Sequence, residues 1–157
     1  MKLNYQWPLP SQPRPIAIIG SGGIVKDAHL PAYQKAEFEV LGVYDINPEQ
    51  SAKIANSWNL KAFGSLDSLI SSAQSQNAVF DLALPPSAVS NVLEQLPEHA
   101  TVLIQKPMGS DFEEAKLIKA ICERKKIDSS SQFSTPLQPN DAGPERCDVQ
   151  RASGADP

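Results

Sequence analysis

The sequence predicts an α/β fold in which a doubly wound parallel sheet forms a single domain. Short apolar runs that suit strands alternate with helix-like stretches between Pro15 and Ile127. The runs are apolar at almost every position, which is typical of strands that are covered on both faces. The first run ends in a glycine-rich turn that opens a helix. Strands and helices that alternate in this way form a parallel sheet with helices on both faces.

Five short segments are expected to be strands. Each is rich in apolar or β-branched residues and is bounded by turn residues. Pro85 and Pro86 end the fourth segment, because proline cannot donate a hydrogen bond to a central strand. The expected strands are 16–19, 38–44, 61–63, 79–84 and 101–104.

Five segments with helical periodicity lie between these strands. Pro31 is expected to bend or break the first helix. Asn47 can cap the second, with Pro48 at its first position. Ser110 and Glu113 have the spacing of a capping box at the start of the last helix. The expected helices are about 24–35, 48–58, 66–70, 87–96 and 110–125.

The composition narrows the class of protein. A length of 157 residues suits one domain, and 41% hydrophobic residues can form a core. The formal net charge of −4 argues against a nucleic-acid-binding protein, which usually carries a basic face. No apolar run approaches the roughly 20 residues of a membrane helix. The two cysteines are too few for a disulfide scaffold or a metal site, so a cytoplasmic protein without a bound metal is expected. Residues 1–14 are polar and rich in proline, which suggests a loose leader without a signal peptide.

The turn after the first strand is a candidate phosphate-binding loop. The segment from Gly20 to Val25 has the pattern G-x-G-x-x-V, with valine where a third glycine is usual. The first glycine allows a tight turn, and the second lets the backbone approach a pyrophosphate. Amides at the start of the helix then face the anionic charge. Such a loop can also be an ordinary turn, so the motif needs a second feature beside it.

Asp45 provides that second feature. It ends the second strand, at about the distance from the loop where a dinucleotide-binding domain carries an acid for the ribose hydroxyls. The alternative is a solvated turn residue, because Asp45 stands just before a helix cap. No arginine follows Asp45, and its carboxylate would face the 2′-phosphate of NADP, so NAD is expected and NADP remains possible. Together the two features predict a nucleotide-binding domain of the Rossmann type.

Three separated motifs make the chain similar to the Gfo/Idh/MocA oxidoreductases, the relatives of glucose–fructose oxidoreductase and inositol dehydrogenase. Residues 20–33 read GSGGIVKDAHLPAY and resemble the opening of that family. Residues 80–87 read FDLALPPS and look like its loop beside the nicotinamide, and 105–107 read QKP where the family has Glu-Lys-Pro. The resemblance covers 15–127. It implies hydride transfer between a nicotinamide cofactor and a sugar, polyol or related alcohol or carbonyl compound. It also implies a second domain for the substrate and an oligomeric full-length protein.

The resemblance also assigns roles to residues. Lys106 corresponds to the family's lysine near substrate and nicotinamide, where an ammonium can hydrogen-bond a hydroxyl and stabilise charge. Gln105 replaces the family's glutamate and keeps a hydrogen-bonding group without its charge. His29 and Asp81 are expected to have structural roles, and Cys122 is expected to fill the core. The expected cofactor-binding residues are Gly20, Ser21, Gly22, Gly23, Ile24, Asp45, Pro85, Pro86, Gln105 and Lys106, and the expected catalytic residue is Lys106.

The sequence changes character after Ile127. Residues 128–157 are rich in serine, proline, glycine and aspartate without periodicity, which indicates a disordered tail. A second interpretation uses the resemblance, since family members continue with a strand like A-x-V-N-F-Q-x-R-F-S-P. A back-translation of 128–141, shifted by one base, can read IAAVNSQLRFSPMM. We therefore expect a frameshift or a sequencing error near Ile127, with the substrate domain missing. Nucleotide binding without efficient turnover would follow.

Two other functions fit the same residues. A Rossmann domain can bind NAD(P) as a sensor without catalysis, and other doubly wound domains bind S-adenosylmethionine. The Pro85-Pro86 loop and Lys106 favour the dehydrogenase over the S-adenosylmethionine protein. An intact reading frame downstream would favour the enzyme over the sensor.

Overall fold

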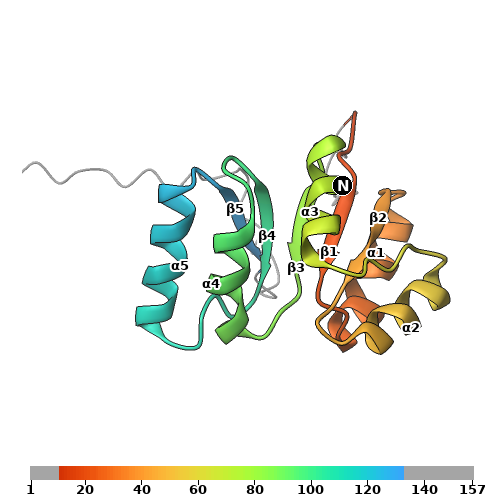
Figure 1. The fold of residues 1–157 in the computed structure, drawn as a ribbon, viewed down its shortest axis with the longest axis horizontal. Helices are drawn as coiled ribbons and strands as arrows, with labels where there is room; N and C mark the ends of the chain where they lie inside the picture. Colours follow the sequence, from red (N-terminus) through yellow and green to blue (C-terminus); the bar gives the residue numbers. More distant parts are fainter. Residues whose placement is uncertain (1–10, 133–157) are drawn as a thin grey trace, which may run out of the picture.

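Five parallel strands form one sheet in the computed structural model, which describes residues 11–132 (Figure 1). The strand order is β2-β1-β3-β4-β5, so the chain runs outward from β1 to β2 and then returns to the other side of β1. This order and the parallel pairing confirm the predicted doubly wound sheet. The strands are β1 (Ile16–Ile19), β2 (Val40–Tyr44), β3 (Val79–Leu82), β4 (Thr101–Gln105) and β5 (Asp128–Gln132).

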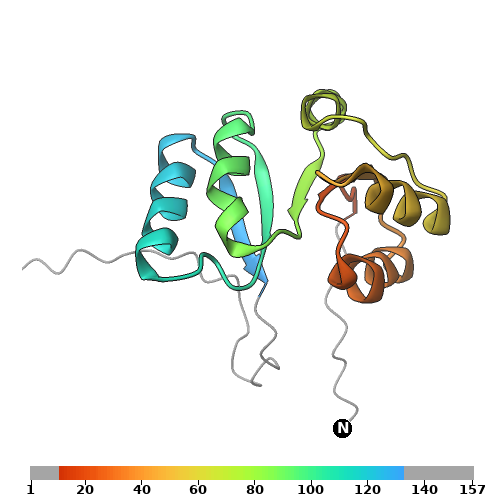
Figure 2. The ribbon, with the colours of Figure 1, turned by 60° about the horizontal axis from the view of Figure 1, so that its bottom comes forward.

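The helices lie on both faces of the sheet (Figures 1 and 2). Alternate residues of β1 face opposite sides, as the pleat of a strand requires. Ile16 and Ile18 join one buried cluster with residues of η1, α1 and α2. Ala17 and Ile19 join the other, with residues of α3, α4 and α5. The helices are η1 (Val25–His29), α1 (Leu30–Lys35), α2 (Pro48–Trp58), α3 (Leu66–Ser75), α4 (Pro86–Gln95) and α5 (Phe112–Arg124).

The helix after the glycine loop changes type in the middle. Its first part, η1, is a π-helix, and α1 continues from Leu30 with Pro31 in its first turn. Proline fits there because its missing N–H leaves few hydrogen bonds unmade in a first turn. The helix is not broken at Pro31 but continues through it, with the change from π-helix to α-helix one residue earlier, at Leu30.

Side-chain caps fix the starts of α2 and α5. Asn47 accepts hydrogen bonds from the amides of Glu49 and Gln50, which confirms the predicted cap. At α5 the cap is Asp111, whose side chain accepts from the amide of Glu114 at 2.9 Å. The predicted box of Ser110 and Glu113 is wrong, because the cap is Asp111 and it is Glu114 whose Oε2 accepts a hydrogen bond, from the amide of Ser110 at 2.6 Å.

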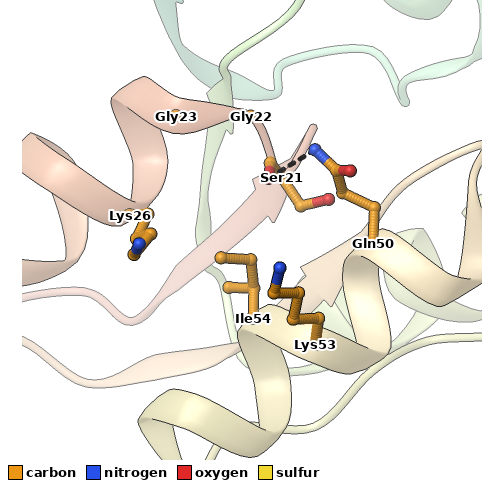
Figure 3. A pocket seen from close by; sticks show the side chains of 7 residues that line it. All are labelled: Ser21, Gly22, Gly23, Lys26, Gln50, Lys53 and Ile54. Atoms are coloured by element: carbon orange, nitrogen blue, oxygen red, sulfur yellow. Dashed lines mark hydrogen bonds between the residues drawn. The ribbon is translucent and has the colours of Figure 1, made fainter.

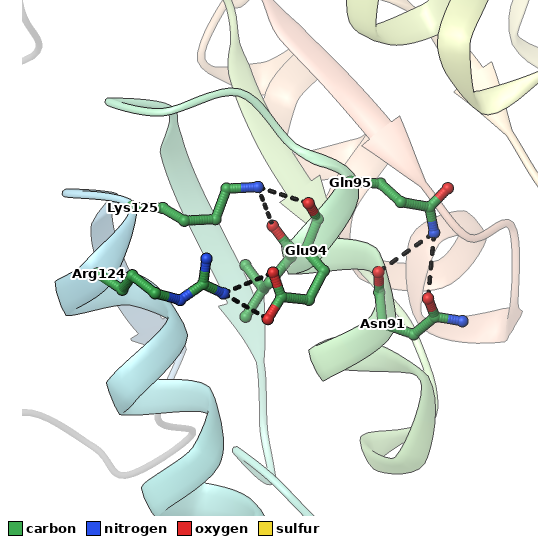
Figure 4. Close-up of polar contacts among 6 residues, drawn as sticks. Asn91, Glu94, Gln95, Arg124 and Lys125 are labelled. Carbon is green, nitrogen blue, oxygen red and sulfur yellow. Dashed lines mark hydrogen bonds and ion pairs between the residues drawn. The ribbon is translucent and has the colours of Figure 1, made fainter.

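One lysine and one arginine at the end of α5 hold this helix against α4 (Figure 4). Lys125 is only 9% exposed, and its Nζ donates to the backbone oxygens of Leu93 at 3.2 Å and Glu94 at 2.5 Å. These carbonyls lie in the last turn of α4, where helix oxygens lack partners within the helix. Arg124 pairs with the Glu94 carboxylate at the surface. Lys125 therefore caps α4 from a neighbouring element.

Two sequence predictions about strands are wrong. Residues 61–63 form no strand, since Ala62 makes only a single bridge with Val43. Conversely, Asp128–Gln132 do not begin an irregular tail but form β5, which pairs with β4 along its length. The Asp128 amide donates to the Ala100 oxygen at 2.9 Å. Backbone pairing at a sheet edge needs no apolar side chains, and Asp128, Ser129 and Ser130 are exposed. The expected leader up to residue 10, and the rest of the expected tail from 133, lie outside the described residues.

Candidate functional site

The turn after β1 requires glycine at its first position. Gly20 has φ +99°, and a Cβ there would lie 2.3 Å from the carbonyl oxygen of Ala83. Its amide donates to the Tyr44 oxygen at 2.8 Å, which ties the turn to the end of β2. The tight turn thus brings the ends of β1, β2 and β3 together.

The second glycine of the loop is not required by any neighbour in the protein. A Cβ on Gly22 would meet no atom within 4 Å, and Gly22 does not have the left-handed φ of Gly20. Its oxygen accepts from the amide of Val25 at 3.1 Å, at the start of η1. The space over Gly22 is therefore open, and the approach of a phosphate to this backbone stays a prediction.

Asp45 faces the glycine loop from the end of β2. Its Oδ2 accepts hydrogen bonds from the amide and the hydroxyl of Ser21, each at 2.7 Å. Its Oδ1 accepts from the amide of Asn47 at 2.9 Å. The carboxylate is thus held at the C-terminal ends of the strands, where ligands of doubly wound sheets bind.

A cavity of about 520 Å³ opens beside this loop. It lies between the end of β1 and α4, at the point where the strand order reverses. Its walls are mainly apolar, with Leu66, Ala83 and Val92 among them. Of the residues expected to bind a cofactor, the cavity brings together Gly20, Ser21, Gly22, Asp45 and Pro85.

A second, smaller pocket of about 160 Å³ lies on the other side of the loop (Figure 3). Gly22 and Gly23 line it, with Lys26 of η1 and Lys53 of α2 on its two sides. Among residues 11–132, neither lysine has a carboxylate partner within 4.0 Å. The two ammonium groups therefore add positive charge beside the glycine loop.

The other expected site residues do not line these cavities. Ile24 faces solvent at 44% exposure, and Pro86 lies in the first turn of α4. Gln105 is the last residue of β4, and Lys106 is exposed in the turn that follows. Gln105 Oε1 accepts from the amide of Lys106 at 2.8 Å, so the two residues are tied together beyond the end of β4.

A buried polar cluster joins β3 to the helix after the glycine loop. Asp81 is fully buried, and its Oδ2 lies 2.7 Å from Nδ1 of His29 and accepts from the Tyr33 hydroxyl at 2.8 Å. Burial raises the pKa of Tyr33 above its usual range, and the Asp81 carboxylate adds to the rise. Tyr33 therefore remains a hydroxyl donor. His29 Nε2 lies 3.3 Å from the amide nitrogen of Gln105.

Sequence reasoning predicted structural roles for His29 and Asp81, and their burial and hydrogen bonds agree with that prediction. It did not find that the two residues are partners, nor that Gln105 continues the cluster. An aspartate inside an apolar strand was the available signal, since a buried carboxylate needs a polar partner. No group of three or more metal-binding side chains occurs among the described residues, and no helix there is long and apolar enough to cross a membrane.

Comparisons with known proteins agree with this geometry. The model of an oxidoreductase family with an NAD-binding Rossmann fold, GFO_IDH_MocA, matches residues 14–132. Glucose-6-phosphate 3-dehydrogenase of Bacillus subtilis is 32% identical over 122 residues, which are 76% of this chain and 33% of the relative.

Two solved structures extend the comparison. UDP-N-acetylglucosamine 3-dehydrogenase GnnA of Acidithiobacillus ferrooxidans is 26% identical, with a TM-score of 0.60 over 72% of this chain and 36% of that one. The WlbA dehydrogenase of Bordetella pertussis, solved with NADH and UDP-GlcNAcA, has a TM-score of 0.63 over 74% of this chain and 35% of that one. At 22% identity, the likeness to WlbA shows the fold.

The chain spans about a third of the length of these relatives. The family match, in contrast, covers the glycine loop, Asp45, the Pro85-Pro86 loop, the Gln-Lys-Pro turn and all five strands. The chain therefore belongs to the Gfo/Idh/MocA family of oxidoreductases, and residues 14–132 are its NAD-binding Rossmann domain.

Proposed function

We propose that this domain binds NAD(H) across the glycine loop and supplies it to an oxidoreductase that moves a hydride to or from a sugar or polyol. The observation that carries the proposal is the open space over Gly22 beside the 520 Å³ cavity. The residues present fit a dinucleotide. The loop offers backbone to the diphosphate, and the carboxylate of Asp45 stands where ribose hydroxyls need an acceptor.

The apolar part of the cavity suits the adenine. Leu66, Ala83 and Val92 line it, and Ile46 beside Asp45 is 90% exposed at its edge. Lys26 and Lys53 lie just outside the loop and favour the negative charge of the diphosphate. Together these residues would hold the adenosine half of a dinucleotide.

NAD is the preferred form in this proposal. The Asp45 carboxylate is an acceptor for ribose hydroxyls, and it would repel the 2′-phosphate of NADP. Ile46 follows Asp45 and carries no charge that could pair with that phosphate. NADPH is therefore expected to bind, if at all, more weakly than NADH.

Bound NAD(H) supplies the hydride acceptor or donor. Lys106 is the residue of this chain that we propose to act in the reaction, by donating a hydrogen bond to the substrate oxygen and stabilising its charge. Lys106 is exposed just beyond the end of β4, at the edge of the sheet where ligands of doubly wound folds bind. Pro85 and Pro86 shape the neighbouring turn at the start of α4.

A sugar is the proposed substrate class because two relatives are named for oxidation of a sugar at its third carbon. These are the dehydrogenases of Bacillus subtilis and Acidithiobacillus ferrooxidans, which share 32% and 26% identity with this chain. A sugar or polyol has vicinal hydroxyls that an ammonium such as that of Lys106 can hydrogen-bond. Membership of the family also favours a dinucleotide over S-adenosylmethionine.

The test is a fluorescence titration of the 157-residue chain with NADH and, separately, with NADPH. We expect saturable binding of NADH and weaker binding of NADPH. No response to either compound would refute the proposal, and tighter binding of NADPH would refute the preference. That the chain alone binds NADH without efficient hydride transfer remains a prediction, which an absorbance assay of NAD reduction with a panel of sugars and polyols checks.

A further inference from the structure

A continuous set of hydrogen bonds connects the middle of β3 to the turn after β4. It begins at Asp81, whose Oδ2 meets Nδ1 of His29 at 2.7 Å. The other ring nitrogen of His29 meets the amide nitrogen of Gln105 at 3.3 Å. Gln105 in turn accepts from the backbone amide of Lys106 at 2.8 Å. The four residues come from three different elements and the turn, so the contacts tie those parts of the fold together.

The side-chain amide of Gln105 determines which ring nitrogen of His29 carries the proton. Its oxygen is occupied by the amide of Lys106, so its nitrogen faces the ring. An amide nitrogen can only donate a hydrogen bond, so His29 Nε2 must accept and cannot carry a proton. The ring proton then lies on Nδ1 and points at Asp81, which accepts it.

Stability alone does not explain Asp81. Asp81 is 0% exposed to water, and its Oδ1 has no hydrogen-bond partner among the described residues. A buried carboxylate with an unsatisfied oxygen costs free energy that an apolar residue at this position of β3 would avoid. What Asp81 does provide is a fixed acceptor for His29.

We infer that His29 is held as its Nδ1–H tautomer, and that Asp81 and His29 are positioning residues for Lys106. They hold Gln105 in one orientation, and Gln105 holds the backbone at Lys106. The positioning role rests on the proposed function, because the place of Lys106 matters only if Lys106 acts beside the nicotinamide. The tautomer rests on geometry alone.

Gln105→Glu is the variant that tests the donor logic. A carboxylate has no proton to donate near neutral pH, so it would face Nε2 of His29 as a second acceptor. The ring then needs a proton on both nitrogens, since Asp81 still accepts from Nδ1. Glutamine and glutamate side chains have nearly the same shape. The change at position 105 therefore alters the charge and the direction of one hydrogen bond with little change in packing.

Long-range ¹H–¹⁵N spectra of the histidine rings give the first readout. The chain has two histidines, and His99 lies exposed on the surface, so His99→Gln assigns the signals. In the unaltered chain we expect a protonated Nδ1 and an unprotonated Nε2 at His29. In Gln105→Glu we expect both nitrogens protonated. A proton on Nε2 in the unaltered chain would overturn the inference without need of any variant, and so would an unchanged ring in Gln105→Glu.

A double-mutant cycle on NADH affinity gives the second readout. Asp81 and Lys106 make no hydrogen bond with each other within residues 11–132, so the effects of replacing them multiply unless the four residues act together. We expect the double variant Asp81→Asn/Lys106→Met to lose less NADH affinity than the product of the two single losses. The difference should be roughly threefold or more. Purely multiplicative losses would overturn the positioning role.

Two variants control this cycle. Tyr33→Phe removes the other hydrogen bond to Asp81 but leaves His29, so it should leave both the tautomer and the effect of Lys106→Met unchanged. Arg124→Gln breaks a surface ion pair far along the chain, and its effect should multiply with that of Lys106→Met. If NADH does not bind at all, the proposed function and the positioning role fall together, while the spectra still decide the tautomer.

Discussion

The α-carbon of Gly20 lies so close to the carbonyl oxygen of Ala83 that a Cβ atom on Gly20 would be 2.3 Å from it. Gly22, two residues later, would place a Cβ in open space. The two glycines of one motif therefore do different work. Gly20 lets the chain pass close to the backbone of Ala83, just after β3, and Gly22 leaves space for a ligand. This difference gives a pair of opposite predictions.

Gly20→Ala is expected to destabilise the fold. The side chain would meet backbone that cannot move aside, and the residue would keep a φ of +99° that alanine rarely adopts. We expect the free energy of unfolding to fall by roughly 2–4 kcal/mol. Urea unfolding followed by circular dichroism measures it. A loss below about 0.5 kcal/mol would contradict the described turn.

Gly22→Ala is expected to fold normally and to bind NADH at least about tenfold more weakly, because its methyl group fills the space of the diphosphate. The measurement is the NADH titration together with an unfolding curve. Gly64→Ala is the matched control, because a Cβ at Gly64 also meets no atom within 4 Å. Gly64 does not line the 520 Å³ cavity. Equal affinities for the two variants would argue against a dinucleotide on this loop.

Asp45→Asn is expected to change the choice between the two cofactors. The amide keeps the size of the carboxylate but removes the charge that would repel a 2′-phosphate. NADH affinity should fall and NADPH affinity should rise, so that their ratio shifts by roughly tenfold. Parallel titrations with both compounds give the ratio. A ratio that stays constant would show that Asp45 serves only the Ser21 turn.

Lys125→Met is expected to cost more stability than Arg124→Gln, although both remove one positive charge from the same helix end. The carbonyls of Leu93 and Glu94 lose their donor when Lys125 is replaced, which costs about 1–3 kcal/mol. Arg124 and Glu94 form an exposed pair, whose loss costs less than about 1 kcal/mol. Urea unfolding of both variants compares them, and the reverse order would be inconsistent with a cap on α4.

The stability of the fold should decline at alkaline pH in a way that depends on Cys122. Burial raises the pKa of the Cys122 thiol, and a hydrogen bond with Ser129 opposes the rise. Above the ordinary thiol pKa of about 8.5, the unfolded chain releases a proton that the folded chain retains. The free energy of unfolding therefore falls as the pH rises through this range. Cys122→Ala should lack this part of the decline, and identical pH profiles would exclude it.

The sheet and the glycine loop could be predicted from the sequence because local patterns determine them. Continuous apolar runs, Asn47 before Pro48, and glycine after Ile19 each have a direct physical meaning at one place in the chain. They led to four of the five strands and to the positions of the glycine loop after β1 and of Asp45 after β2. The NAD-binding Rossmann fold is confirmed by the family match.

What was missed depends on distant partners. Strand β5 has a row of serines and no apolar signal, and only the exposed edge of β4 determines that it pairs. The partnership of Asp81 with His29 joins residues of β3 and η1 across the sheet face. Nothing in the spacing of these residues indicates that contact, since it depends on where the helix crosses the strands.

The strand order has one further consequence for the domain. Asp45 belongs to the part of the chain that runs out to β2, and Pro85 to the part that returns to β3, yet both border the same cavity. A ligand bound there would contact both parts of the chain, and its binding free energy would add to the free energy of unfolding of the domain. The lifetime of the polypeptide in a cell would then rise and fall with the local supply of its dinucleotide.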